Sequence, residues 1–140
     1  MILTIVLITL VIDNSNSIEN KILFKVNNEI ITSLDILDEL KYLQTINKEF
    51  ETIKKEEAFQ ISKNSLIREK IKEIEIKKIV REIKFKDKIL DNLILKYFKE
   101  LKITSIPEFE KFFLSKDIDP NKIRKKITIE VLWNELVYNK

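Results

Sequence analysis

The hydrophobic pattern of this chain begins with two short runs that are typical of β-strands. Residues 21–26 (KILFKV) and 29–32 (EIIT) are rich in Ile, Val and Phe, and only Asn27 and Asn28 separate them. Asparagine tolerates the left-handed backbone conformation that two-residue hairpin turns require. The pattern therefore predicts a small β-hairpin near the N-terminus.

The spacing then changes to one that favours helices. Four leucines recur at three-residue intervals from Leu34 to Leu43, which predicts a first helix over about residues 34–46. Thr32 or Ser33 is placed to cap its N-terminus, and Asp35 in the first turn interacts favourably with the helix dipole.

Two further helices are predicted after a charged connection at residues 48–57. Apolar residues from Phe59 to Ile83 predict a long second helix, and a broad apolar stripe from about Lys86 to Leu101 predicts a third. The second helix also carries a face of mixed charge, which we expect to be solvated because such faces usually lie in water. That face comprises Arg68, Glu69, Lys72, Glu73, Glu75, Lys77 and Lys78.

The last two helices have clear start signals. Ser105 is a capping residue followed by an early proline and by Glu108, and the short helix that it begins is predicted to end near Lys116. Asp119-Pro120 repeats this arrangement and begins a helix that runs to about Tyr138. The predicted fold is mainly α: an orthogonal array of about five helices with a small N-terminal β-hairpin.

The missing residue types exclude most kinds of catalytic site. The chain of 140 residues fits one domain, and it contains no His, Cys or Gly. It therefore lacks an imidazole base, a thiolate nucleophile and the usual zinc ligands, and it lacks the glycine loops that approach phosphates closely. We expect no enzymatic activity, no metal and no cofactor.

The charge pattern argues against a nucleic-acid surface. The chain has 26 basic and 23 acidic residues, and its lysines alternate with glutamates. One basic cluster, at Lys122, Arg124, Lys125 and Lys126, leaves a nucleic-acid-binding helical domain as a remote alternative. A solvated helix face is the ordinary explanation of such a cluster.

The N-terminus has the pattern of an export signal. Residues 2–12 (ILTIVLITLVI) are uncharged and apolar, and as a helix they would rise only about 16 Å, roughly half the bilayer core. Ser15 and Ser17 are small residues suited to cleavage after Ser17. We predict a signal peptide or N-terminal anchor at residues 1–17 and a single domain at residues 18–140. A buried first strand is the alternative, because Ile, Val and Thr favour strands.

Several segments together resemble the N-terminal chaperone domain of the SurA family. The most specific is Val26-Asn27-Asn28-Glu29-Ile30-Ile31-Thr32-Ser33-Leu34-Asp35-Ile36, which follows a signal segment and a short strand. Further agreement lies in residues 65–71 (SLIREKI), in the short helix at residues 106–114 and in residues 123–127 (IRKKI). Their order and approximate spacing match over nearly the whole chain after the signal segment.

The resemblance implies a periplasmic holding chaperone of a Gram-negative bacterium that binds unfolded outer-membrane proteins. Family members usually continue into parvulin prolyl-isomerase domains and a C-terminal docking helix, neither of which this sequence contains. The resemblance therefore predicts an exposed apolar groove that a partner chain covers, or a second copy through self-association. Two alternatives stay open: a structural or assembly subunit of a folding complex anchored at the inner membrane through residues 2–12, and the N-terminal fragment of a parvulin-type isomerase.

Aromatic side chains are the candidates for client binding, because a holding chaperone needs apolar surface that adapts to many sequences. Burial in the core is the ordinary alternative for each of them. We expect Phe113 and Trp133 to be the more exposed, since Phe109, Phe112, Leu132 and Leu136 already fill the inward stripes of their helices, and Trp133 is expected to report client binding by its fluorescence. The candidates are Tyr42, Phe50, Phe112, Phe113, Trp133 and Tyr138.

Overall fold

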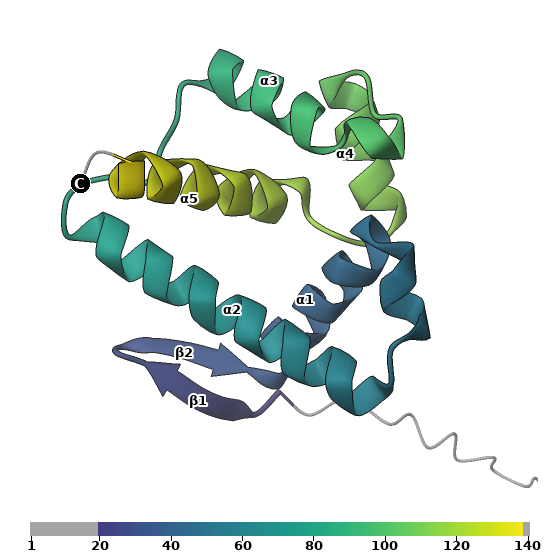
Figure 1. Ribbon diagram of the computed structural model, residues 1–140, viewed down its shortest axis with the longest axis vertical. Coiled ribbons are helices and arrows are strands. Elements are labelled where there is room, and N and C mark those ends of the chain that lie inside the picture. The colour runs from purple at the N-terminus through teal and green to yellow at the C-terminus, as the bar shows by residue number, and fades with distance from the viewer. Residues whose placement is uncertain (1–19, 139–140) are drawn as a thin grey trace, which may run out of the picture.

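A computed structural model describes residues 20–138 and shows five α-helices after an N-terminal hairpin (Figure 1). Strands β1 (Ile22–Val26) and β2 (Glu29–Thr32) pair antiparallel, and Asn27 takes the left-handed conformation with φ of 54°. The predicted hairpin is confirmed. The predicted signal peptide or anchor at residues 1–17 lies outside the described residues.

Helix α1 (Ser33–Ile46) begins with a reciprocal cap. The Asp35 amide donates to the Thr32 hydroxyl at 3.3 Å, and the Asp35 carboxylate accepts from the Thr32 amide at 2.8 Å. These bonds satisfy amides that a helix start otherwise leaves unpaired. A short 3₁₀ helix, η1 (Lys48–Thr52), then occupies part of the connection that the sequence left irregular, and it buries Phe50.

Helix α2 (Lys55–Lys77) ends earlier than the hydrophobic spacing predicts. Val80 and Ile83 continue that spacing but lie in the connection to α3, so this part of the prediction is wrong. No Gly or Pro marks the end of α2, and the local sequence therefore carries no stop signal. The chain leaves the helix where it must cross to reach α3, which makes the boundary a consequence of tertiary packing.

The last two helices begin where their capping residues predict, and the third begins near its expected start at Lys86 without a side-chain cap. Helix α3 (Asp87–Tyr97) is followed by the 3₁₀ helix η2 (Lys99–Leu101). Ser105 caps α4 (Ile106–Ser115). Asp119 accepts the Asn121 amide at 2.9 Å at the start of α5 (Pro120–Tyr138).

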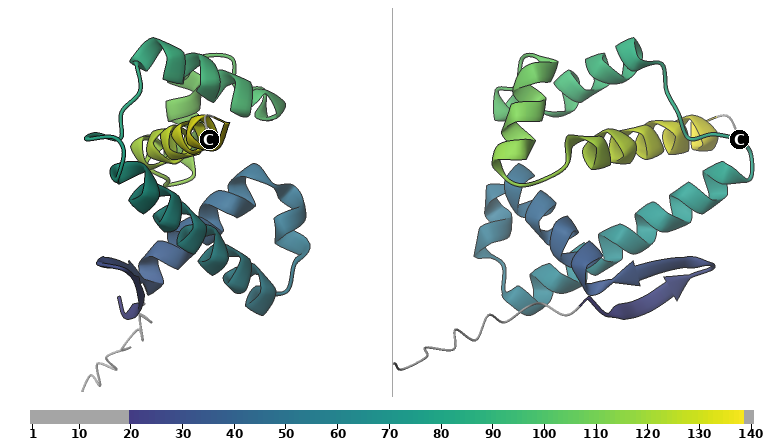
Figure 2. Two further views of the ribbon diagram at one scale, coloured as in Figure 1. Left: turned by 60° about the vertical axis from the view of Figure 1, so that its left-hand side comes forward. Right: turned by 180° about the vertical axis from the view of Figure 1, so that it is seen from behind.

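Helix α5 lies between α2 and α3, with the hairpin on the far side of α2 (Figures 1 and 2). The main core is formed by α3, α4 and α5, and its centre is three phenylalanines whose ring centroids lie 5.1 to 5.6 Å apart: Phe98, Phe109 and Phe113. Such rings contribute both buried area and favourable ring contacts. The observed fold is mainly α with a small N-terminal hairpin, as predicted.

Candidate functional site

A groove of about 670 Å³ opens between α3 and the second half of α5. It forms because the apolar stripe of α3 is wider than the surface that packs in the core: Leu90 and Ile94 are buried, while Leu93 and Tyr97 face the groove. The lining residues are Leu93, Lys96, Tyr97, Val131, Asn134, Glu135 and Tyr138. Aliphatic and tyrosine side chains thus form most of the wall, and polar groups lie among them.

The groove leaves large aromatic surface in contact with water. Tyr97 is 53% exposed and Tyr138 is 88% exposed. Ile89, one helical turn before Leu93 on α3, is 45% exposed and continues the same apolar stripe. Exposed apolar residues gathered along one groove are typical of binding surfaces, whereas single exposed residues need no explanation.

Charges of opposite sign stand on the two walls of the groove. Lys96 lies on α3 and Glu135 lies on α5, and both are exposed. Neither forms an ion pair within residues 20–138. The two charges therefore remain available to a molecule lying between the helices.

A second hollow, of about 370 Å³, adjoins the groove at Tyr97 and is charged. Its walls come from α1, α2 and α5, with three acidic and three basic side chains among them. The lining residues are Glu39, Tyr42, Leu43, Ile46, Ser65, Arg68, Glu69, Lys72, Tyr97, Lys126, Ile127 and Glu130. This hollow differs from the groove in that its charges mostly pair with one another.

Lys126 joins two carboxylates in this second hollow. Its ammonium lies 2.7 Å from the Glu39 carboxylate, it also pairs with Glu69, and the hydroxyl of Ser65 donates to Glu39 at 2.7 Å. Glu39 is only 3% exposed, so its charge depends on these partners. Burial lowers the pKa of Lys126, but attraction to the two glutamates outweighs it and raises the pKa overall. The Lys126 ammonium thus stays charged, and its contacts hold α1, α2 and α5 together.

A second carboxylate, Glu73, is buried between α2 and α5. Lys125 of α5 and Lys77 of α2 each lie 2.9 Å from its Oε1 atom, and Lys70 lies 3.5 Å from Oε2. Burial alone would raise the pKa of Glu73, but the hydrogen bonds from Lys125 and Lys77 outweigh it and lower the pKa to about 2. Glu73 is therefore ionised at neutral pH.

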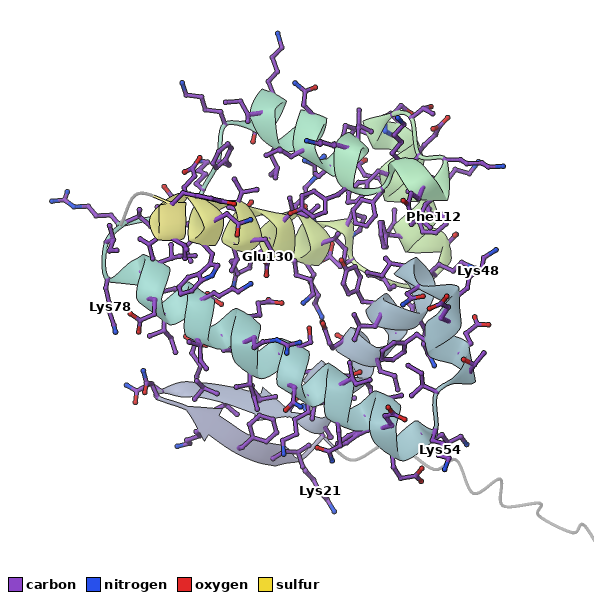
Figure 3. All side chains as sticks on the ribbon, viewed as in Figure 1. Lys21, Lys48, Lys54, Lys78, Phe112 and Glu130 are labelled. Atoms are coloured by element: carbon purple, nitrogen blue, oxygen red, sulfur yellow. The ribbon has the colours of Figure 1, made fainter. Side chains whose placement is uncertain are left out.

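Part of the α2 face that was expected to be solvated forms the contact with α5, so that prediction is wrong for Glu69, Lys72 and Glu73. Arg68, Lys77 and Lys78 of the same face are exposed, as expected. Glu69 and Glu73 pair with lysines of α5, and Lys72 binds both carboxylate oxygens of Glu130 at 2.6 and 2.7 Å. Figure 3 shows Glu130 in the space between the two helices. The two helices meet through complementary charges, a partnership that the α2 sequence alone does not reveal.

The basic cluster of α5 has the same explanation. Each member pairs with an acidic residue, at 2.6 to 2.9 Å where Asp38, Asp91 and Glu73 are the partners of Lys122, Arg124 and Lys125. Lys126 pairs with Glu39 and Glu69 as described above. A cluster neutralised in this way offers little positive surface to a nucleic acid.

The structure separates the six aromatic candidates. Tyr138 lines the groove, and Tyr42 lines the charged hollow instead. Phe112 is half-buried against the core, and Phe50 is buried at 5% exposure. Trp133 is half-buried and is not part of the groove lining.

Phe113 is fully buried, so the expectation that it is exposed is wrong. Its ring lies 5.1 Å from both Phe98 and Phe109 and 6.4 Å from Tyr42, measured between centroids. A ring that is 0% exposed and packed among these side chains cannot reach a client. The neighbouring Phe112 is less buried than Phe113. The hydrophobic spacing of α4 predicts the opposite, with Phe112 facing inward and Phe113 exposed.

Sequence reasoning missed Leu93, Tyr97 and Val131 as groove residues. Leu93 and Tyr97 belong to the broad apolar stripe that predicts the third helix. The signal that could have found them is the width of that stripe, because eight apolar positions between residues 89 and 101 exceed what one helix contact buries.

Comparisons of the chain with protein-family models, with curated proteins and with solved structures found no match. Among residues 20–138, no helix is long and apolar enough to cross a membrane. The same part of the chain holds no group of three or more acidic residues arranged for a metal ion.

Proposed function

We propose that this domain holds non-native polypeptides by binding their apolar segments in the groove between α3 and α5. The observation that carries the proposal is the groove itself, with Leu93 and Val131 in its walls and the exposed rings of Tyr97 and Tyr138 beside them. Aromatic and aliphatic walls bind apolar side chains without demanding one sequence. The domain acts by binding alone in this proposal and requires no cofactor.

The expected affinity is modest. Burial of one large apolar side chain contributes about 1.5 to 3 kcal/mol, and association costs offset part of the sum over two or three such side chains. Dissociation constants of roughly micromolar to millimolar follow. Weak, reversible contact suits a holding function, because a client must leave in order to fold.

The proposed clients are unfolded outer-membrane proteins, and the proposed location is the periplasm. Two features of the sequence support both parts: the apolar run at residues 2–12, followed by small polar residues, and the resemblance of Val26–Ile36 and the later helices to the SurA family. The paired basic cluster of α5 leaves a nucleic-acid partner with little support.

Suppression of aggregation tests the proposal. An outer-membrane protein unfolded in urea is diluted into buffer, and light scattering is followed with and without the chain. We expect the wild type to slow the scattering and the variant Tyr97→Glu/Tyr138→Glu to lose most of this effect, because both side chains are exposed and line the groove.

Leu114→Glu is the matched control. Leu114 is 62% exposed on α4 and is not part of the groove lining, so this variant should protect as well as the wild type. Circular dichroism verifies that both variants keep their helices. Equal protection by the groove variant and the wild type would contradict the proposal.

A structural subunit that packs permanently on one partner is the second candidate. It is favoured by exposed apolar side chains outside the groove, on the hairpin and at the start of α1, where Ile22, Leu23, Ile30 and Leu34 are 41 to 62% exposed. Promiscuity separates the candidates: a holding module protects several unrelated unfolded proteins, whereas such a subunit protects none of them.

A further inference from the structure

We infer that the segment taken by this groove is an amphipathic α-helix with an acidic flank toward α3 and a basic flank toward α5. The inference rests on the proposed function and narrows it, since it names the conformation and charge pattern of the bound segment. The segments of a client that the groove holds are then those that can form such a helix, and its strictly alternating strand segments are held weakly. Three observations carry it: the kind of wall, the length of the apolar stripe and the two rim charges.

Both walls of the groove are helices, so their backbone amides and carbonyls are already bonded within α3 and α5. An extended segment needs a strand edge or polar side chains to satisfy its own backbone, and an unpaired amide in an apolar site is costly. Among residues 20–138, Asn134 is the single side-chain amide in the lining. A helix satisfies its backbone internally and brings only side chains to the groove.

The apolar stripe matches two turns of such a helix. Ile89, Leu93 and Tyr97 are spaced by four residues on α3, so the stripe extends over about 12 Å. Val131 and Tyr138 face it from α5, seven residues apart. An occupant with apolar residues at positions i, i+4 and i+7 presents a stripe of the same length.

The rim charges define which flank of the helix faces which wall. Lys96 on α3 attracts an acidic flank, and Glu135 on α5 attracts a basic flank. Neither has an ion-pair partner in the described part of the chain, so an occupant meets no competing partner. A helix with one acidic and one basic flank therefore binds in a single direction along the groove.

Synthetic peptides test the inference with the full chain. The reference peptide has 14 residues, blocked ends, apolar positions at i, i+4, i+7 and i+11, glutamates on one flank and lysines on the other. A second peptide has the same composition in strict apolar–polar alternation, and a third has proline at its centre. Binding is followed by the anisotropy of a labelled peptide, and helix formation by circular dichroism.

We expect the reference peptide to bind and to gain helix on binding. The proline peptide should bind roughly 100-fold more weakly, because proline in a helix interior removes a hydrogen bond and clashes with the preceding turn. The alternating peptide should bind at least about tenfold more weakly, since as a helix it spreads its apolar residues around all sides. Equal or tighter binding of the alternating peptide would overturn the inference.

Variants of the rim test the charge pattern. Lys96→Glu makes both rims acidic, so a peptide with lysines on both flanks should gain affinity a few-fold over one with glutamates on both. Glu135→Lys makes both rims basic and should reverse this order. If neither variant changes the order of the two peptides, the assigned flanks are wrong.

The groove variant Tyr97→Glu/Tyr138→Glu separates the inference from the proposed function. If it abolishes binding of the alternating peptide, and the reference peptide does not bind the wild type, the groove binds polypeptides but not as helices, and only the inference fails. If every peptide binds this variant as well as the wild type, the groove is not the site, and both fail. Loss of reference-peptide binding in this variant, but not in Leu114→Glu, supports both.

Discussion

Glu73 offers the sharpest test of how α2 and α5 are held together. It is 3% exposed, and it forms ion pairs with Lys77 of its own helix and with Lys125 of α5. The change Glu73→Gln keeps the size of the side chain and removes its charge. We expect this variant to unfold more easily at neutral pH, because three ammonium groups lose their shared anion.

The pKa of Glu73 gives the size of the effect. A fall from 4.5 to about 2 corresponds to about 3 kcal/mol of stabilisation of the folded state, at about 1.36 kcal/mol for each tenfold change. The side chains of Lys77 and Lys125 are 49% and 50% exposed, so water screens part of this interaction. We therefore expect Glu73→Gln to lower the free energy of unfolding by about 2 kcal/mol.

The sign of the pH dependence follows from the lowered pKa. The unfolded chain binds a proton at Glu73 below about pH 4.5, and the folded chain does so only near pH 2. The stabilisation is therefore complete above pH 4.5 and is lost as the pH falls from 4.5 toward 2. The difference between the wild type and Glu73→Gln should shrink over the same range.

Urea unfolding of both proteins between pH 7 and pH 3, followed by the fluorescence of the single tryptophan, measures these differences. Glu75→Gln is the matched control, because Glu75 lies on the same helix and its pair with Lys78 is exposed. That variant should cost less than about 0.5 kcal/mol. The reasoning is refuted if the two variants cost the same at pH 7, or if the cost of Glu73→Gln does not decline below pH 4.5.

Three further predictions concern stability and are checked by the same unfolding measurement. Phe113→Ala should cost about 3 to 5 kcal/mol because it leaves a cavity among four rings, and a cost below about 1 kcal/mol would contradict the burial of Phe113. Lys126→Met should cost about 3 kcal/mol by leaving Glu39 buried without its cation, and a neutral effect would show that Glu39 is satisfied in another way. Asp119→Ala should cost about 1 kcal/mol through the lost cap of α5, whereas Asp119→Asn should cost much less.

Local sequence signals predicted the hairpin and most helix starts correctly. The Asn27-Asn28 turn and the caps at Thr32, Ser105 and Asp119 all lie where those residues indicate. Each signal works within three or four residues, because a cap or a tight turn is formed by side chains and amides that are neighbours in the chain.

Signals that depend on distant partners were misread from the sequence. The α2 carboxylates Glu69 and Glu73 have the spacing of a solvated face, and only the approach of Lys125 and Lys126 makes that face an interface. Phe113 has the spacing of an exposed residue, yet rings from other elements enclose it. In both cases the spacing of apolar and charged residues along one helix does not specify which other helix packs on which of its faces.

The sequence by itself determined the mainly helical class, the hairpin and the absence of His, Cys and Gly chemistry, because composition, period and caps are local properties of the chain. Only the tertiary structure decided where α2 ends, which charges are buried and that α3 and α5 leave a groove between them. These features depend on which apolar and charged faces of helices far apart in sequence pack against one another. Those contacts are decided by the packing of the whole domain.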